Sequence, residues 1–105
     1  MFNFQIGLRF DHNSIVEIES GAFQNLPKLE TLILTKNGIS QISRNTFKHL
    51  PSLHKIKLND NLIKRLEEKS FSDLLSLKDL HLQHNLIDTI NDRAFVRVPS
   101  LRYEK

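Results

Sequence analysis

Two histidines and an aspartate lie close together late in the sequence, in the order Asp79, His81 and His84. Imidazole nitrogens and carboxylate oxygens are common zinc ligands, and a catalytic zinc site needs three protein ligands around an open position. His12 lies far earlier in the chain, and there is no cysteine to complete a site. No nucleophile motif accompanies these residues either. We therefore expect neither a metal centre nor a hydrolase, and no cofactor.

A group of basic residues is the second candidate for chemistry, because ammonium and guanidinium groups bind phosphate backbones. The group consists of Lys55, Lys57, Lys64, Arg65 and Lys69. Acidic residues are interleaved with it, and the net charge of the whole chain is only +3. No set of exposed aromatic residues is expected beside it, although such rings are the usual stacking platforms for single strands. The sequence therefore does not favour nucleic-acid binding.

The elements that carry these residues follow from an asparagine that recurs every 24 residues, at Asn13, Asn37, Asn61 and Asn85. Each asparagine stands in the same frame, L-x-x-L-x-L-x-x-N-x-I-x-x-I-x-x-x-x-F-x-x-L. The second copy is complete and contains Leu29, Leu32, Leu34, Asn37, Ile39, Ile42, Phe47 and Leu50. Among the apolar slots of all copies, only Gln5 breaks the pattern. Self-similarity at a fixed period of this length indicates a solenoid.

Within the frame, the segment L-x-x-L-x-L alternates as a half-buried strand does. Leu32 and Leu34 point inward, whereas Thr31, Ile33 and Thr35 point to the other face. One such strand per copy gives a parallel sheet, and its crossover connections should be right-handed. Each asparagine falls where the strand bends, and its amide can satisfy backbone groups of the turn. We therefore predict an α/β fold, a right-handed solenoid of four full coils.

The return passages are expected to be short helical turns, 3₁₀ turns or loops. Ile39, Ile42 and Phe47 would fill the interior from this side. The polar stretch after Ile42 fits a brief helical turn that ends at Pro51, because the residue before a proline disfavours α geometry.

This frame, with F-x-x-L-P endings at Pro27 and Pro51, resembles the leucine-rich repeat in its 24-residue class. The resemblance covers roughly residues 5 to 103 of the single domain expected for this length, residues 1–105. It divides the chain into coils at about residues 5–28, 29–52, 53–76 and 77–100. It also implies that an inner, concave sheet carries the binding surface, and that the partner is a protein.

The candidate binding residues are the outward-facing strand positions and the two positions that follow them. Unlike the asparagine and phenylalanine columns, these columns change in charge and size from copy to copy, which favours recognition, although solvated positions free to drift would look the same. The candidates are Arg9, Asp11, His12, Thr31, Ile33, Thr35, Lys36, Lys55, Lys57, Asn59, Asp60, Asp79, His81, Gln83 and His84.

The size and the ends of the array suggest a larger assembly. Four strands give a patch of roughly 400 Å², whereas a standard interface takes about 800 Å² per partner. A solenoid also needs capping units with a polar outer face, and none is evident. We therefore expect a segment of a longer array, or a weak binder, with self-association through uncapped ends as a further option. Alternatively, the chain is complete and Phe2, Phe4 and Ile6 cover its first coil.

The resemblance also implies an extracellular or cell-surface setting, since the class is typical of matrix proteins and receptor ectodomains. Secretory-signal features and an N-x-S/T sequon are both missing from the sequence. No apolar run is long enough to span a membrane. A cytoplasmic, intracellular scaffold and a structural spacer without a ligand of its own therefore remain as alternatives.

Overall fold

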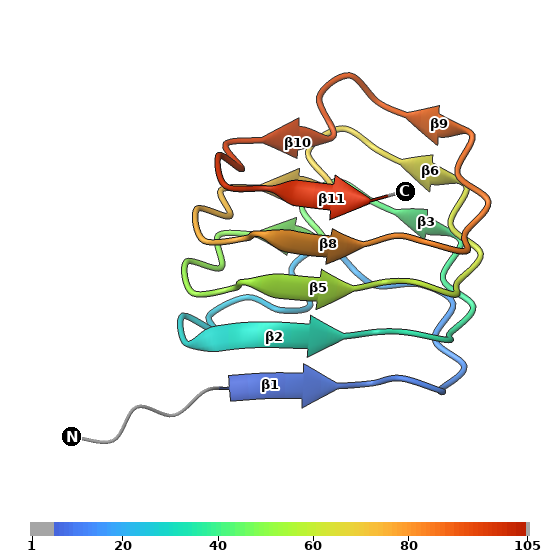
Figure 1. Cartoon of the computed structure of the whole chain (residues 1–105), viewed down its shortest axis with the longest axis horizontal. Coiled ribbons are helices and arrows are strands. Elements are labelled where there is room, and N and C mark those ends of the chain that lie inside the picture. Colours follow the sequence, from blue (N-terminus) through green and yellow to red (C-terminus); the bar gives the residue numbers. More distant parts are fainter. Residues whose placement is uncertain (1–5, 105) are drawn as a thin grey trace.

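The chain winds into a parallel β-solenoid of about four turns, which the computed structural model describes for residues 6–104 (Figure 1). Its largest sheet holds one strand from each coil and one more strand that follows the last coil. The strands lie in the order β1 (Ile6–Arg9), β2 (Leu29–Ile33), β5 (Lys55–Lys57), β8 (Asp79–His81) and β11 (Arg102–Glu104). All neighbours in this sheet are parallel, which confirms the predicted strand in each copy.

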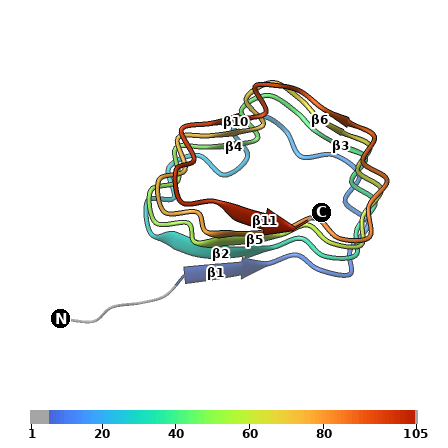
Figure 2. The same ribbon diagram turned by 45° about the horizontal axis from the view of Figure 1, so that its top comes forward.

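Two smaller sheets form the return side of the solenoid, and their strands are two residues long. One sheet holds β3 (Gln41–Ile42), β6 (Arg65–Leu66) and β9 (Thr89–Ile90), and the other holds β4 (Phe47–Lys48), β7 (Phe71–Ser72) and β10 (Phe95–Val96). In Figure 2 the chain runs to the right along the large sheet, returns to the left along the small sheets, and rises coil by coil. The solenoid is therefore right-handed, as predicted.

Of the predicted return passages, the helical and 3₁₀ turns are wrong and the loops are confirmed, because the described residues contain strands, turns and loops but no helix. The architecture is consequently a β-solenoid rather than an α/β fold. The backbone N–H groups of the return side bond to neighbouring coils. Phe47 N donates to Ser70 O of the following coil at 3.1 Å, and Glu67 N donates to Ile42 O of the preceding coil at 3.1 Å. Strands stack at about 4.8 Å, whereas a helix with its side chains is about 10 Å wide. Coils stacked at strand spacing on both sides leave no room for helices.

The asparagine ladder joins each coil to the one before it. Asn61 Nδ2 donates to Leu58 O of its own coil and to Leu34 O of the preceding coil, both at 3.0 Å. Its Oδ1 accepts from Asn37 N at 3.1 Å and from Ile39 N at 3.2 Å. Asn37 and Asn85 also bond to the coil before their own, whereas the side chain of Asn13 donates only within its own coil. The predicted role at the turn is confirmed, and the ladder also holds successive coils together.

A stack of phenylalanine rings fills the interior on the return side. Neighbouring rings lie nearly parallel, with centroids 5.8 Å apart from Phe23 to Phe47 and 5.2 Å apart from Phe47 to Phe71 and from Phe71 to Phe95. The two central rings are fully buried. The other predicted core positions of the second copy, Leu29, Leu32, Leu34, Ile39, Ile42 and Leu50, are buried as well.

The first and last coils are less completely packed. Phe10 is 36% exposed although it occupies a core slot, and Leu8 and Phe23 of the same coil are partly buried. Ile87 and Ile90 of the fourth coil are also partly buried. The expectations about Phe2, Phe4 and Gln5 lie outside the described residues.

A second ladder, which the sequence did not predict, runs along the corner that leads into the large sheet. Ser52 Oγ donates to Pro27 O at 2.7 Å, and Ser76 Oγ donates to Pro51 O at 2.6 Å. Ser100 repeats the contact to Leu75 O at 3.4 Å. Each hydroxyl therefore bonds to a carbonyl 25 residues earlier and joins neighbouring coils at a second corner.

Left-handed residues mark the corners of the coil. Three columns contain them: the residue before the ladder asparagine, the residue two before the column phenylalanine, and the residue two after it. The non-glycine members, all with φ between 52° and 61°, are His12, Asn25, Lys36, Asn45, His49, Asp60, Lys69, Asp73, His84 and Arg97. For residues with a Cβ this conformation costs roughly 1–2 kcal/mol each. The sharp bends between sheets are therefore obtained at some expense in stability.

Candidate functional site

The register of the large sheet places the predicted outward positions in straight columns. Thr31 pairs with Lys55, and Lys55 pairs with Asp79. In the central column, Lys57 lies between Ile33 and His81. Arg9 precedes Ile33 in that column and Gly7 precedes Thr31 in the other. The predicted columns are therefore confirmed as geometry, and binding by their residues stays a prediction.

The side chains of these columns form an open surface, which we call the sheet face. Ile33, Lys55, Lys57 and His81 are half-buried by their neighbours, and Asp79 is exposed. In contrast, the alternate positions of the same strands, such as Ile56 and Leu80, are buried in the core. The strands therefore separate a uniform interior from a sheet face whose composition changes at every step.

Three of the predicted residues form a charge cluster at the end of β1. Arg9 Nε and Nη2 each donate to the Asp11 carboxylate at 3.3 Å, and His12 Nδ1 lies 3.0 Å from the same group. The hydrogen bonds from Arg9 and then His12 lower the pKa of Asp11 to about 2. The carboxylate is consequently ionised and engaged at neutral pH, so it has less capacity to bind a partner's cation.

A second cluster crosses three coils at the same edge. Thr35 Oγ1 donates to Asn59 Oδ1 at 3.1 Å, and Asn59 Nδ2 donates to Asp60 Oδ2 at 2.8 Å. His84 Nδ1 lies 3.1 Å from Asp60 Oδ1. The amide of Asn59 is the main cause of a lowered pKa at Asp60, and burial opposes it while His84 and the charge of Lys36 add to it. The structure therefore brings Thr35, Asn59, Asp60 and His84 together, and their polar groups mainly contact one another.

The residues before each ladder asparagine lie at the corner rather than on the flat sheet. His12, Lys36, Asp60 and His84 all have left-handed backbones, with φ of 58° to 61°. Consequently His84 bonds to Asp60 of the preceding coil, whereas His81 stands on β8 beside Lys57. Across residues 6–104, no group of three histidine, cysteine, aspartate or glutamate side chains is placed to hold a metal ion.

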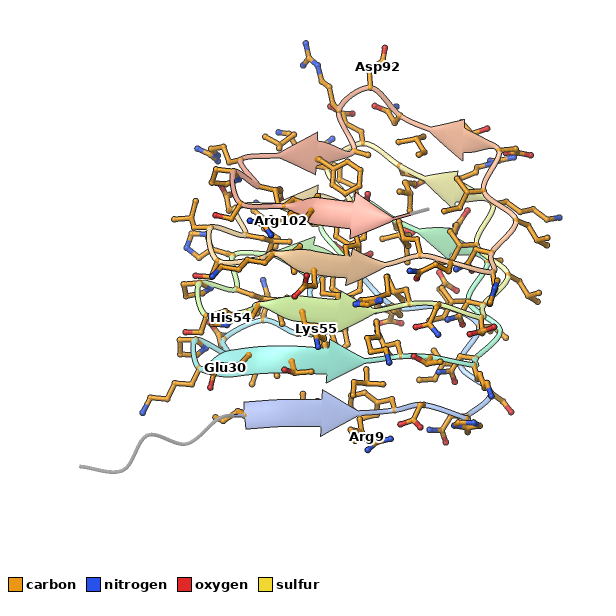
Figure 3. The ribbon with its side chains drawn as sticks, viewed as in Figure 1. Arg9, Glu30, His54, Lys55, Asp92 and Arg102 are labelled. Carbon is orange, nitrogen blue, oxygen red and sulfur yellow. The ribbon has the colours of Figure 1, made fainter. Side chains whose placement is uncertain are left out.

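Two further features were not among the predicted site residues. They are the column of Glu30 and His54 at the amino end of the strands, and Arg102. Glu30 and His54 lie next to each other there (Figure 3), with 3.9 Å between His54 Nδ1 and Glu30 Oε1. Arg102 follows Asp79 in the register. Both could have been found from the sequence. Glu30 and His54 occupy the first variable position of the L-x-x-L segment, and Arg102 belongs to the incomplete fifth copy.

The comparison with family models agrees with this architecture. The family model described as "Leucine rich repeat" matches residues 8–63 and 51–103, so the chain belongs to the leucine-rich repeat family. A solved structure titled "Crystal structure of leucine-rich repeat domain of APL1B" is similar to it, with 18% sequence identity and a TM-score of 0.47. The similarity covers 90% of this chain, which spans 38% of that one. No curated protein matches the chain.

Membership defines the broad class of activity. Leucine-rich repeat domains are generally protein-binding modules and are typically non-catalytic. Among the described residues there is also no helix of sufficient length and hydropathy to cross a membrane.

Proposed function

We propose that this chain is a protein-recognition module whose partner binds the sheet face. The observation that carries this proposal is the contrast between the two sides of the same strands. Inward positions repeat the same residue types and are buried, for example Leu32, Ile56 and Leu80. Outward positions differ in every coil, as Ile33, Lys57 and His81 do. These diverse side chains are half-buried on a rigid sheet, which gives a partner a fixed surface with a distinct composition.

The dimensions of the sheet face limit the strength of binding. Four or five strands at about 4.8 Å spacing, with about six residues each at about 3.3 Å, present roughly 400–500 Å². Stable interfaces use about 800 Å² per partner. The sheet face therefore supports either a weak complex or one part of a larger contact surface, and the second form fits a longer array of the same repeat.

We further propose an extracellular or cell-surface setting for this recognition, with an intracellular scaffold as the alternative. The support is the resemblance to the 24-residue class, in which each copy carries the phenylalanine of the ring stack. Locating the protein in fractionated cells by immunoblotting, with and without protease treatment of intact cells, distinguishes the two settings.

The proposed function is tested by charge reversal on opposite sides of the same coil. The variant Lys55→Glu/Lys57→Glu alters the sheet face, and the control Lys64→Glu/Arg65→Glu alters exposed positions on the return side. We expect affinity capture to retain the same partners with wild type and control and to lose them with the sheet-face variant. Circular dichroism must show that both variants are folded. Equal capture by both variants would favour a spacer without its own ligand.

A further inference from the structure

We infer that the segment that meets the centre of the sheet face is an acidic, extended polypeptide, whose carboxylates at alternate positions lie over Lys55 and Lys57, with His81 at its edge. This inference rests on the proposed function and names the chemistry of the partner. It follows from which charges of the sheet face already have partners and which do not.

Three of the carboxylates on and around the sheet face are already engaged by this chain. Asp11 accepts both bonds from Arg9, and Asp60 accepts from Asn59 and lies against His84. Glu30 lies 3.9 Å from His54. These groups form the rim of the sheet face, where contacts within the chain already occupy each carboxylate.

The cations at the centre are not balanced in this way. Within the described part of the chain, neither Lys55 nor Lys57 lies within 4.0 Å of a carboxylate oxygen. The ladder neighbours of Lys57 are Ile33 and His81, neither of which is acidic. Asp79 is the ladder neighbour of Lys55 and also of Arg102, so this one carboxylate stands between two cations. Glu104 is the ladder neighbour of His81, so the register sets three basic residues, Lys55, Lys57 and Arg102, against two acidic ones, Asp79 and Glu104. The centre of the sheet face therefore has an excess of positive charge that an acidic partner can complement.

The spacing of these groups selects an extended partner. Lys55 and Lys57 are two residues apart on one strand, so their side chains leave the sheet about 6.6–7 Å apart. Carboxylates at alternate positions of an extended peptide have the same separation. His81 lies one strand further, at about 4.8 Å from Lys57, and offers a ring nitrogen to the edge of the same segment. A helical segment with carboxylates at every second residue would direct them to different sides.

Nucleic acid fits this arrangement less well than an acidic peptide does. Asp60 and Asp79 flank the lysines on either side, and they would repel a continuous phosphate backbone. The described sheet-face columns from Gly7 to Gln83 also contain no phenylalanine, tyrosine or tryptophan on which a base could stack, and aromatic stacking contributes much of the affinity for single strands. A polypeptide can instead place its acidic residues over the lysines and neutral residues over the carboxylates.

The test is a nuclear magnetic resonance titration of the full ¹⁵N-labelled chain, because isolated exposed ion pairs strengthen binding only about 1.5- to 5-fold each. The probe is an eight-residue peptide that alternates Glu and Thr. A peptide with the same residues in two blocks is the spacing control, and oligothymidylate of equal charge is the nucleic-acid control. We expect the largest amide shifts at Lys55, Lys57 and His81, and tighter binding of the alternating peptide than of either control.

Charge variants complete the test. The substitution Lys57→Glu should weaken binding of the alternating peptide at least threefold, whereas Lys64→Glu on the return side should change it less than twofold. The inference is overturned if the shifts centre on other residues, if Lys57→Glu leaves the affinity unchanged, or if the block peptide or oligothymidylate binds as tightly as the alternating peptide.

The outcome is separable from that of the proposed function. If affinity capture depends on the sheet face but the alternating peptide does not bind, recognition by the sheet face stands and the acidic partner is refuted. If capture does not depend on the sheet face, the proposed function fails, and peptide binding alone does not restore it.

Discussion

Replacement of the buried ladder amide, Asn61→Ala, should destabilise the solenoid far more than the same change at its first position. The Asn61 side chain makes four bonds of 3.2 Å or less, to two carbonyls and two N–H groups of the backbone, and a longer bond of 3.4 Å to Asn59 O. The residue is 5% exposed. Alanine removes all of these bonds without supplying another partner. A net contribution of about 1 kcal/mol per bond, with a further penalty for groups left buried and unpaired, gives a loss of about 3–5 kcal/mol.

The first ladder position is a control within the same protein. Asn13 donates to two carbonyls of its own coil, Phe10 O at 2.9 Å and Asp11 O at 3.2 Å, and it is exposed. Water can replace these bonds, so Asn13→Ala should cost about 0.5–1 kcal/mol. The loss at Asn61 should therefore exceed that at Asn13 by at least about 2 kcal/mol.

The measurement is urea denaturation followed by far-ultraviolet circular dichroism, with free energies compared only if the dependence on urea is unchanged. Domains of this size have a total stability of about 5–15 kcal/mol, so Asn61→Ala can leave too little folded protein to measure. In that case Asn37→Ala, whose amide is partly exposed, should give an intermediate loss. Equal losses at Asn61 and Asn13 would refute the idea that the ladder holds coils together.

Three further changes test separate parts of the structure. Phe47→Ala should cost about 3–5 kcal/mol in the same titration, because its ring is fully buried between two others; a loss below about 1 kcal/mol would contradict the ring stack. Lys69→Gly should leave the free energy of unfolding unchanged or raise it by up to about 1 kcal/mol, since glycine relieves the strain at its φ of 52°. The control Lys64→Gly should lower the free energy of unfolding by about 0.5–1 kcal/mol. Equal losses in the two variants would argue against the left-handed corner. The depressed pKa of Asp11, about 2, means that its ionised form stabilises the fold above its unfolded value near 3.9. This contribution is lost as pH falls through about 2. Asp11→Asn should therefore flatten the dependence of the free energy of unfolding on pH in that range. An unchanged pH dependence would exclude the Arg9 contact.

The sequence was sufficient to predict the features that repeat in register. The asparagine and phenylalanine columns predicted the strands, the turns and the buried positions, because each coil faces the same neighbours and so needs the same residues. The right hand of the solenoid followed from the general rule for parallel crossovers. The outward columns of the sheet face also followed, since a strand with a buried face has only one possible register.

The return passages could not be predicted in the same way. Local signals such as Pro51 after a short polar stretch are compatible with a helical turn. The deciding factor is the stacking distance between coils, which lets Phe47 N and His49 N reach the next coil. The contacts between Thr35 and Asn59 and between Asp60 and His84 span 24 residues. They depend on side-chain orientations, which an alignment of the four copies does not provide. The charge balance of the sheet face was therefore visible only in three dimensions.

The asparagine ladder gives the solenoid unequal resistance at its two ends. Each turn is completed by the amide of the coil that follows it, as Asn61 completes the turn of Asn37. Pulling away a coil from the amino-terminal side breaks the same bonds, but the next turn keeps the amide of the coil that follows it, as the turn of Asn61 keeps Asn85. Pulling away a coil from the carboxy-terminal side instead removes the acceptor of backbone N–H groups in the turn before it, as for Asn37 N and Ile39 N. That turn is then less stable. Under mechanical load, therefore, unravelling should run more easily from the carboxy-terminal side toward the amino terminus than in the opposite direction.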